Sequence, residues 1–475
     1  MLTQVIRTDN PEFDFVFDEQ FSAAYDLLEN DPSPVFVTGK AGTGKSTLLQ
    51  YFREHTSKNI VVLAPTGVAA VNVRGQTIHS FFRFRPDITP EGVHSIRLRK
   101  AQKTIYKKLD AVVIDEISMV RSDLLDCVDA FLRLHGPDET APFGGIQMIF
   151  FGDLYQLPPV MTRLDRDIFK DVYASPYFFD ARSFKQLDFQ IIELKKIYRQ
   201  KDEAFIRLLN NVRDKSISVT DLDILNRRLN PRFNPGDKDF YVYLTTTNAL
   251  ADQINQERAK ELPGESFHLE GELSNGFDVR SLPTHQRLEL KTGAQVMLLN
   301  NDPGGKWVNG TIGKIFSSSK DHEATARGSL RGGTIRVALA SGLVVEVAPF
   351  TWEVFRFFYN KDTEQIDSES AGSFRQYPLK LAWAITIHKS QGKTFSKVVL
   401  DIGNGTFAPG QMYVALSRCT DLEGLVLKKP IFQRHILLDD QVVRFMTQAL
   451  AIGSPRGGSS KKLQYNGFQI KFKQI

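Results

Sequence analysis

The sequence predicts an α/β fold with two α/β domains, a small insertion in the first domain and an antiparallel β insertion in the second. In the first half, short strand-like runs alternate with longer amphipathic segments, and a second such set begins near residue 191. Between residues 286 and 376 the strand-like runs continue without helical periodicity. At roughly 150 residues per domain, a chain of 475 residues with 42% hydrophobic content suits about three packed units.

The first domain is expected to span residues 1–190. Its predicted strands are the apolar runs VFVT (35–38), IVVLA (60–64), AVVID (111–115) and QMIFF (147–151). A loop and a longer amphipathic segment follow each run, which is typical of a parallel sheet covered by helices. Residues 81–108 interrupt this rhythm and form a basic insertion.

The second domain is expected to comprise residues 191–285 and 377–451, with strands at IIEL (191–194), YVYLTTT (241–247), VVLDI (398–402) and LVL (425–427). Between its two parts, residues 286–376 predict a small antiparallel barrel or sandwich, from the runs AQVMLL, TIGKIF, TIRVALASGLVVEVA and WEVFRFF. Residues 452–475 begin with GSPRGGSSKK and are expected to form a flexible basic tail.

Composition narrows the class of protein. The longest apolar runs fall short of the roughly 18 residues that cross a bilayer, and residues 1–10 lack an apolar signal core. We therefore expect a soluble, cytoplasmic protein without a membrane partner. The two cysteines, Cys127 and Cys419, have no metal-ligand spacing, so they predict packing residues. The net charge of +5 allows a polyanionic partner without requiring one.

A phosphate-binding loop is predicted at residues 39–46, GKAGTGKS, which fit the pattern G-x-x-x-x-G-K-[ST] between a strand and a helix. Backbone N–H groups there can surround a phosphate, and Lys45 would neutralise the β and γ phosphates of ATP. Ser46 would be a ligand of Mg²⁺. The nucleotide-binding residues of this segment are expected to be Gly42, Thr43, Gly44, Lys45, Ser46 and Thr47.

Adjacent acids end the strand AVVID, about 70 residues after this loop. Asp115 is expected to hold Mg²⁺ together with Ser46, and Glu116 to act as the general base for the attacking water. Gln156, just after the strand QMIFF, is expected to detect the γ phosphate. Small-molecule kinases and GTPases also bind nucleotides in this way.

Two arginines favour a motor over those enzymes. Arg199, in IYRQ, opens the second domain, and Arg418, in YVALSR, lies near its end. Both could face a nucleotide held by the first domain and stabilise charge in the transition state. Two domains closing on one nucleotide would open and close as it is hydrolysed.

Taken together, these motifs resemble the Pif-type DNA helicases, of the RecD-related branch of helicase superfamily one, subgroup B. The resemblance runs from about residue 18 to 430. It rests on FDEQ (17–20), GKAGTGKST (39–47), APTGVAA (64–70), GQTIHSFF (75–82), VVIDEISMV (112–120), residues 123–147, GDLYQLPPV (152–160), IYRQ (197–200), LTTTN (244–248), LAWAITIHKSQGKT (381–394) and YVALSR (413–418).

The resemblance implies two RecA-like P-loop domains, with a wedge-bearing insertion in the first and an SH3-like β-barrel in the second. It implies that Gln20 reads adenine, that Gly392 lies at the nucleotide, and that Gln156, Arg199 and Arg418 surround the γ phosphate. The implied activity is ATP- and Mg²⁺-dependent 5′-to-3′ movement on single-stranded DNA, with roles in DNA repair, recombination and telomere maintenance. The expected partners are single-stranded DNA and fork or partial-duplex DNA, with G-quadruplex DNA a further candidate, and the protein is expected to be a monomer.

A nucleic-acid track is predicted from polar residues at strand ends and helix starts. Thr77, His79 and Ser80 stand beside Phe81 and Phe82. Alternatively, Phe81 and Phe82 are core residues and His79 is a buried histidine with its hydrogen bonds satisfied. The other members expected in the first domain are Pro65, Thr66 and Gly67. Those expected in the second domain are Thr246, Asn248, Thr386, His388, Lys389 and Ser390.

The basic insertion at residues 81–108 has two interpretations. Its arginines and lysines could hold the phosphates of incoming strands while an exposed apolar tip blocks re-stacking of the first base pair. Alternatively, it is a solvated hairpin anchored by Phe84, Ile88, Val93 and Ile105. For the whole chain, two rival functions remain: a translocase that separates no duplex, and an ATP-gated module that only binds single strands.

Overall fold

The computed structural model describes residues 5–7, 14–16, 18–161, 169, 171–200, 202–236, 239–274, 276–279, 282–318 and 333–451. The predicted tail at 452–475 lies outside these residues. A short antiparallel pair, β1 (Val5–Arg7) and β2 (Asp14–Val16), precedes the first domain. No helix in the described ranges is both long and apolar enough to cross a membrane.

The first domain is built on a six-stranded sheet in the order β5-β4-β6-β7-β3-β8. All its pairs are parallel, as the alternation of strands and helices predicts. The strands are β3 (Val35–Gly39), β4 (Ile60–Ala64), β5 (Gln76–Thr77), β6 (Ala111–Ile114), β7 (Gln147–Phe151) and β8 (Gln190–Leu194). The helices are α1 (Glu19–Asn30), α2 (Lys45–His55), α3 (Gly67–Asn72), α4 (Ile78–Phe82), α5 (Lys100–Lys107) and α6 (Ser122–His135). Strands β3, β6 and β7 are buried along their whole length because helices cover both faces.

The boundary predicted after residue 190 is wrong. Strand β8 contains the run IIEL, and it pairs with β3 in register from Val35 and Gln190 to Gly39 and Leu194. It is therefore the edge strand of the first sheet. The sequence of a single strand does not indicate which sheet the strand joins. The alternation of strands and helices that begins at β8 therefore could not assign this strand to a sheet.

Helix α12 (Asp440–Ala451) also belongs to the first domain in space, although its position in the chain placed it in the second. Its buried residues Val442, Phe445 and Met446 are part of the first domain's hydrophobic core. The ring of Phe445 stacks on that of Phe179, with centroids 4.4 Å apart. The apolar face of α12 is buried there because the aromatic cluster offers it a matching surface.

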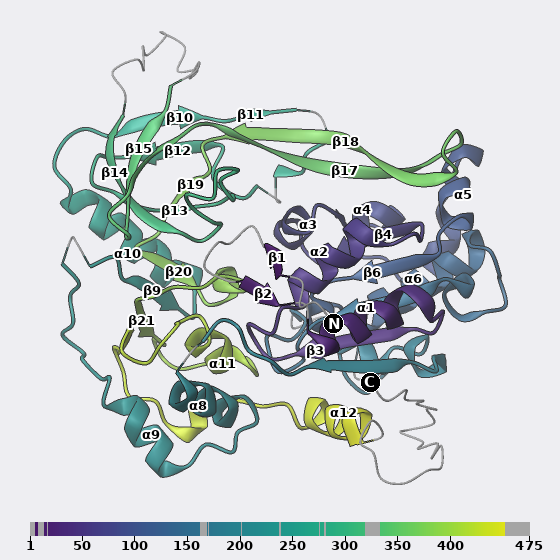
Figure 1. Cartoon of the computed structure of the whole chain (residues 1–475), viewed down its shortest axis with the longest axis horizontal. Coiled ribbons are helices and arrows are strands. Elements are labelled where there is room, and N and C mark those ends of the chain that lie inside the picture. The colour runs from purple at the N-terminus through teal and green to yellow at the C-terminus, as the bar shows by residue number, and fades with distance from the viewer. Residues whose placement is uncertain are drawn as a thin grey trace.

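The second domain has a four-stranded parallel sheet in the order β20-β9-β21-β22. Its strands are β9 (Val242–Thr245), β20 (Ala384–Thr386), β21 (Val398–Asp401) and β22 (Leu425–Leu427). Its helices are α8 (Glu203–Arg213), α9 (Val219–Asn226), α10 (Asn248–Glu261) and α11 (Gln411–Leu416). The two sheets lie side by side, with α11 facing the first domain (Figure 1).

The antiparallel insertion is present but wider than residues 286–376. A five-stranded sheet, β16-β15-β14-β13-β19, contains β13 (Gln295–Leu298), β14 (Ile312–Ser318), β15 (Ile335–Leu339), β16 (Val344–Val347) and β19 (Leu379–Leu381). Two smaller sheets contain β10 (Phe267–Glu270), β11 (Glu272–Leu273), β12 (Arg287–Leu290), β17 (Phe350–Asn360) and β18 (Gln365–Gln376). Strands β10, β11 and β19 thus extend the insertion beyond both predicted ends.

The long hairpin β17–β18 reaches from this insertion across to the first domain (Figure 1). Phe357, Tyr359 and Ile366 pack against the first domain's core. The backbone N–H of Ile366 donates to Asn59 Oδ1 at 2.8 Å, and Lys108 lies 5.5 Å above the Tyr359 ring. The hairpin therefore joins the β insertion to the basic insertion at residues 81–108.

Within residues 81–108 the apolar side chains are anchors. Phe84, Val93 and Ile105 are 7%, 0% and 6% exposed, and half-buried Ile88 packs against the same core. The predicted exposed apolar tip is therefore wrong for these residues, because burial beside an existing core removes their surface from water. The exposed residues of the loop are mainly polar, including Arg83, Arg85 and Asp87.

Candidate nucleotide site and nucleic-acid track

The phosphate-binding loop joins β3 to α2. Gly42 and Gly44 have φ values of 81° and 87°, a left-handed conformation that favours glycine. A Cβ atom on Gly42 would also lie 2.5 Å from Arg199 Cβ, so the absent side chain leaves room for Arg199 to pack on the loop. The loop and Arg199 are therefore in direct contact.

Lys45 is the first residue of α2 and turns back into the loop. Its ammonium group donates to the carbonyl oxygens of Gly39 at 2.7 Å and Lys40 at 3.0 Å. Burial lowers the pKa of Lys45, because the nearby carboxylates do not fully compensate its buried positive charge. Ser46 is exposed at the start of the helix and Thr47 is half-buried, whereas Thr43 is buried.

The two acids follow β6. Burial raises the pKa of Asp115 to about 6, and burial together with Asp115 raises that of Glu116 to about 7. Glu116 has φ 50° and ψ 44°, a strained conformation for a non-glycine residue that is often found at functional sites. These carboxylates lack enough positive charge nearby, which is the condition that a bound cation relieves.

Gln391 brings the second domain to these acids. Its Nε2 donates to Glu116 Oε2 at 3.2 Å and lies 3.5 Å from Gln156 Oε1. Gln156 is 8% exposed. In the sequence, Gln391 is one of the polar donors before Gly392 that predict the nucleic-acid track, and no contact between it and Glu116 is predicted. The structure thus brings Glu116, Gln156 and Gln391 together.

The two predicted arginines differ in their bonding. Arg199 has a buried Nη1 with no hydrogen-bond partner, and burial lowers its pKa. Arg418 is 1% exposed, and its guanidinium donates to Val414 O at 2.9 Å, to Lys393 O at 3.2 Å and to Ser417 Oγ at 2.7 Å. Arg199 has a donor available for an anion, whereas most donors of Arg418 are already used.

Three residues of this site were missed in the sequence. Asp153 and Arg213 form a buried ion pair between the two domains, 3.0 Å from Oδ1 to Nη2. The Tyr413 hydroxyl accepts the backbone N–H of Ala41, in the phosphate-binding loop, at 2.9 Å. Asp153 and Tyr413 lie inside recognised motifs, so a closer examination of GDLYQLPPV and YVALSR could have found them. Nothing in the pattern of α8 distinguishes Arg213.

Gln20 connects α1 to the chain that leaves β8. Its Nε2 donates to Glu193 O at 2.8 Å, and its Oε1 accepts from the backbone N–H of Lys195 at 3.0 Å. Both ends of the amide are therefore in use, and adenine recognition by Gln20 stays a prediction. Gly392 has φ 77°, with open space around its Cβ position.

In the first domain, the predicted track lies at two helix starts. Thr66 Oγ1 accepts from Ala69 N at 3.2 Å and caps α3, and Thr77 Oγ1 accepts from Ser80 N at 3.1 Å and caps α4. His79 is half-buried, and burial and Arg121 lower its pKa. Pro65 and Gly67 are half-buried beside Thr66. Phe81 and Phe82 are buried at 5% and 0% exposure, which confirms that they are core residues.

In the second domain only part of the predicted track faces outward. The hydroxyls of Thr246 and Ser390 donate to Ile402 O and Ile387 O, and both residues are buried. Thr386 is 4% exposed, so the side chains of these three residues are unavailable to a phosphate, which corrects the expectation for them. Asn248 and Lys389 are exposed and His388 is half-buried.

The His388 ring lies parallel to that of Phe407, at an interplanar angle of 15° and a centroid distance of 6.3 Å. Phe407 is 63% exposed and was not predicted. A solitary aromatic in a loop gives no signal in the sequence.

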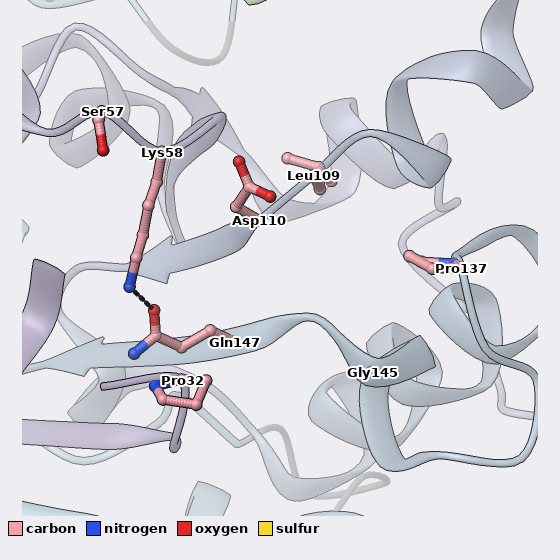
Figure 2. Close-up of a pocket in the computed structure, with 8 residues that line it drawn as sticks. All are labelled: Pro32, Ser57, Lys58, Leu109, Asp110, Pro137, Gly145 and Gln147. Carbon is pink, nitrogen blue, oxygen red and sulfur yellow. Dashed lines mark hydrogen bonds between the residues drawn. The ribbon is translucent and has the colours of Figure 1, made fainter. Parts of the chain in front are cut away.

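A cavity of about 550 Å³ opens near the amino ends of strands β4, β6 and β7 of the first sheet (Figure 2). Lys58 Nζ in its wall donates to Gln147 Oε1 at 2.8 Å, and Asp110 Oδ2 accepts from Asn59 N at 2.7 Å. These polar groups are satisfied within the fold, and the cavity is separate from the phosphate-binding loop at the carboxyl end of β3.

Comparison with known proteins identifies the family of this chain. A family model described as PIF1-like helicase matches residues 11–222, and one described as DNA helicase Pif1, 2B domain, matches residues 272–317. The ATP-dependent DNA helicase Pif1 of Bdellovibrio bacteriovorus is 32% identical over 442 residues, which cover 90% of this chain and 91% of that protein. The chain spans 50% to 60% of the length of three longer relatives, from Trypanosoma brucei brucei, Homo sapiens and Emericella nidulans.

The structure of Bacteroides sp Pif1 in complex with ADP-AlF4 is 36% identical, with a TM-score of 0.83, and the match covers 93% of this chain and 98% of that chain. Bacteroides Pif1 bound to ssDNA, also 36% identical, gives a TM-score of 0.65 over 92% of this chain and 97% of that chain. Both parallel-sheet domains are therefore RecA-like, as expected. From this similarity along nearly its whole length, the chain belongs to the PIF1-like helicase family.

Proposed function

We infer that this chain is an ATP-dependent DNA helicase that moves 5′ to 3′ along single-stranded DNA and separates duplex or structured DNA. The observation that carries this inference is the nucleotide site shared by two domains, in which Gln391 of the second domain bonds to Glu116 of the first. A site that needs both domains changes as they separate, so nucleotide turnover can drive stepping. A relative named as an ATP-dependent DNA helicase and the structure of Bacteroides Pif1 bound to ssDNA support DNA as the track.

In hydrolysis, Lys45 and the backbone N–H groups of its loop hold the β and γ phosphates. Glu116 accepts the proton of the attacking water, and the adjacent Gln156 and Gln391 orient that water. The unpartnered Nη1 of Arg199 donates to the γ phosphate as its charge develops. Arg418 has fewer N–H groups to offer, because Val414 O, Lys393 O and Ser417 Oγ already accept from it.

Ser46 and Asp115 fit a magnesium ion. The Ser46 hydroxyl stands at an exposed helix start, and Asp115 carries a raised pKa that a cation would lower. Among the described residues, no cluster of three or more His, Cys, Asp and Glu side chains could hold a metal ion. Ser46 and Asp115 would hold Mg²⁺ together with phosphate and water oxygens. When bound, Mg²⁺ supplies Lewis-acid stabilisation of the phosphates.

The proposed DNA contacts are Thr66 and Thr77 in the first domain and Asn248, His388 and Lys389 in the second. The exposed cations of the basic insertion, among them Arg83, Arg85 and Arg97, contact the phosphates of incoming strands at a fork. Fork and partial-duplex DNA are the proposed substrates. Quadruplex DNA is a second candidate substrate, and the working unit is a monomer.

A fluorescent strand-separation assay tests this function. Partial duplexes with either a 5′ or a 3′ single-stranded tail are incubated with ATP and Mg²⁺, with a non-hydrolysable ATP analogue as the control. Separation that requires hydrolysis and a 5′ tail is the expected result. DNA-stimulated hydrolysis without separation would identify a translocase, and DNA binding without hydrolysis would identify a binding module.

A second assay locates strand separation. Arg83, Arg85 and Arg97 are replaced together by glutamine, which removes exposed cations of the insertion and keeps the anchors Phe84, Val93 and Ile105. If the basic insertion acts at the fork, separation falls sharply while ATP hydrolysis on single strands stays near normal. A parallel decline of both activities, or a change in neither, would place the separating element elsewhere.

A further inference from the structure

An ion pair joins the two RecA-like domains beside the catalytic residues. Asp153 follows β7 in the first domain, and Arg213 is the last residue of α8 in the second. The Arg213 Nη2 lies 3.0 Å from Asp153 Oδ1, and the two residues are 8% and 1% exposed. A charge pair buried this deeply is stable only while both partners are present.

The same carboxylate holds Gln156. Gln156 Nε2 donates to Asp153 Oδ2 at 3.2 Å, and the backbone N–H of Tyr155 donates to Oδ1 at 3.2 Å. Gln156 Oε1 in turn lies 3.5 Å from the Nε2 of Gln391, which donates to Glu116. A chain of contacts therefore runs from Arg213 through Asp153 to the two glutamines at the general base.

The second domain encloses this segment from two sides. The Arg213 guanidinium lies 3.9 Å above the Tyr155 ring. At the start of α11, a Cβ on Gly410 would lie 2.3 Å from Gln156 O, so the backbones of the two domains are in close contact there. Although burial opposes ionisation, Arg213 holds the pKa of Asp153 below its usual range, so the carboxylate is charged.

We propose that Asp153 and Arg213 are positioning residues whose ion pair makes the placement of Gln156 at Glu116 depend on closure of the two domains. When the second domain moves away, Asp153 loses its buried cation and Gln156 loses a fixed anchor. Hydrolysis is then confined to the closed arrangement. This proposal rests on the proposed ATP-driven function and adds a reason why turnover follows closure.

A double-mutant cycle tests the proposal on the full chain, with Asp153→Asn, Arg213→Gln and the double variant. We measure kcat and KM for ATP hydrolysis saturated with single-stranded DNA. Each single variant is expected to lower kcat by about tenfold to a hundredfold, because a small misplacement of a catalytic group has an effect of that size. KM is expected to change less than about threefold, since the proposed role of the pair is to position Gln156 rather than to bind ATP. The double variant is no worse than the poorer single variant, because the pair is broken only once.

Arg213→Lys and a control pair separate positioning from folding. Lysine keeps the charge but loses the flat stack on Tyr155, so an intermediate kcat with unchanged unfolding temperature is expected. Lys185→Gln breaks the Lys185–Asp180 ion pair, 2.9 Å long and within the first domain, and should leave kcat unchanged.

Two outcomes would overturn the proposal. In the first, the losses in kcat of the two single variants multiply in the double variant. In the second, Arg213→Lys has the kcat of the parent protein and Arg213→Gln differs from the parent only in KM. If the parent protein itself hydrolyses no ATP on DNA, the proposed function has failed. The two failures are therefore distinguishable.

Discussion

The nucleotide site and the nucleic-acid track are assembled to different degrees. At the nucleotide site, side chains from both domains are already in contact, and Arg199 keeps a buried donor without a partner. Along the track, Thr246, Thr386 and Ser390 are buried, while Asn248 and Lys389 are exposed. The first region is preorganised around developing charge, and the second offers scattered contacts to a uniform polymer. Substitutions at the nucleotide site should therefore have large effects on ATP hydrolysis, and substitutions along the track should have small effects on DNA affinity.

The largest effect is expected at Glu116. Glu116→Gln should reduce DNA-stimulated hydrolysis by about 10²-fold to 10⁴-fold because the general base is lost. ATP binding, measured by equilibrium titration with a fluorescent analogue, should persist. Lys45→Ala should remove hydrolysis by weakening phosphate binding instead. Substantial turnover by Glu116→Gln would refute the assignment of the base.

The arginines should come next, and they should be unequal. Arg199→Ala is expected to lower kcat by about 10²-fold to 10³-fold, since a preorganised donor to the transition state is removed. Arg418→Ala should also lower kcat, and in addition lower the unfolding temperature, because its guanidinium bonds three groups of the second domain. Steady-state kinetics and thermal unfolding of both variants test this. Loss of nucleotide affinity with intact turnover would contradict both roles.

The pH dependence of hydrolysis should reveal the raised pKa of Glu116, about 7 in the free protein. The base works only when ionised, so kcat/KM should fall as pH decreases below about 7, approaching tenfold per unit. The same profile measured on Glu116→Gln should lack this acid limb. An acid limb with a midpoint near the ordinary glutamate value would show that the acids are not short of positive charge.

The smallest effect is expected on the track. Lys389→Ala should weaken single-stranded DNA binding only a few-fold and lower the salt dependence of the affinity by about one phosphate contact. Ser390→Ala, at a buried neighbour, should leave affinity unchanged. Fluorescence anisotropy at several salt concentrations measures both. Equal losses for the two variants would mean that the loop rearranges to expose Ser390.

Much of this architecture could be predicted because it is local in the chain. Continuous apolar runs and the loop GKAGTGKS gave the strands and phosphate site of the first domain, and Asp115 and Glu116 followed from the end of β6. Relations between distant segments could not be predicted. The pairing of β8 with β3, the docking of α12 and the contact of Arg213 with Asp153 depend on which surfaces meet, and no periodicity encodes that choice. The buried state of Thr386 and Ser390 depends likewise on neighbours supplied by the rest of the second domain.

Helix α12 also limits how the molecule can move. The chain enters the second domain after Leu194 and returns between Leu427 and Asp440 to dock α12 on the first domain. The Tyr177 hydroxyl donates to Asp439 Oδ2 at 3.0 Å and so binds the segment before α12 to the first domain. The second domain is thus connected to the first by the chain at two places, and the hairpin β17–β18 adds a further contact. These connections resist sliding and detachment, so a rotation of one domain against the other is the movement that we expect.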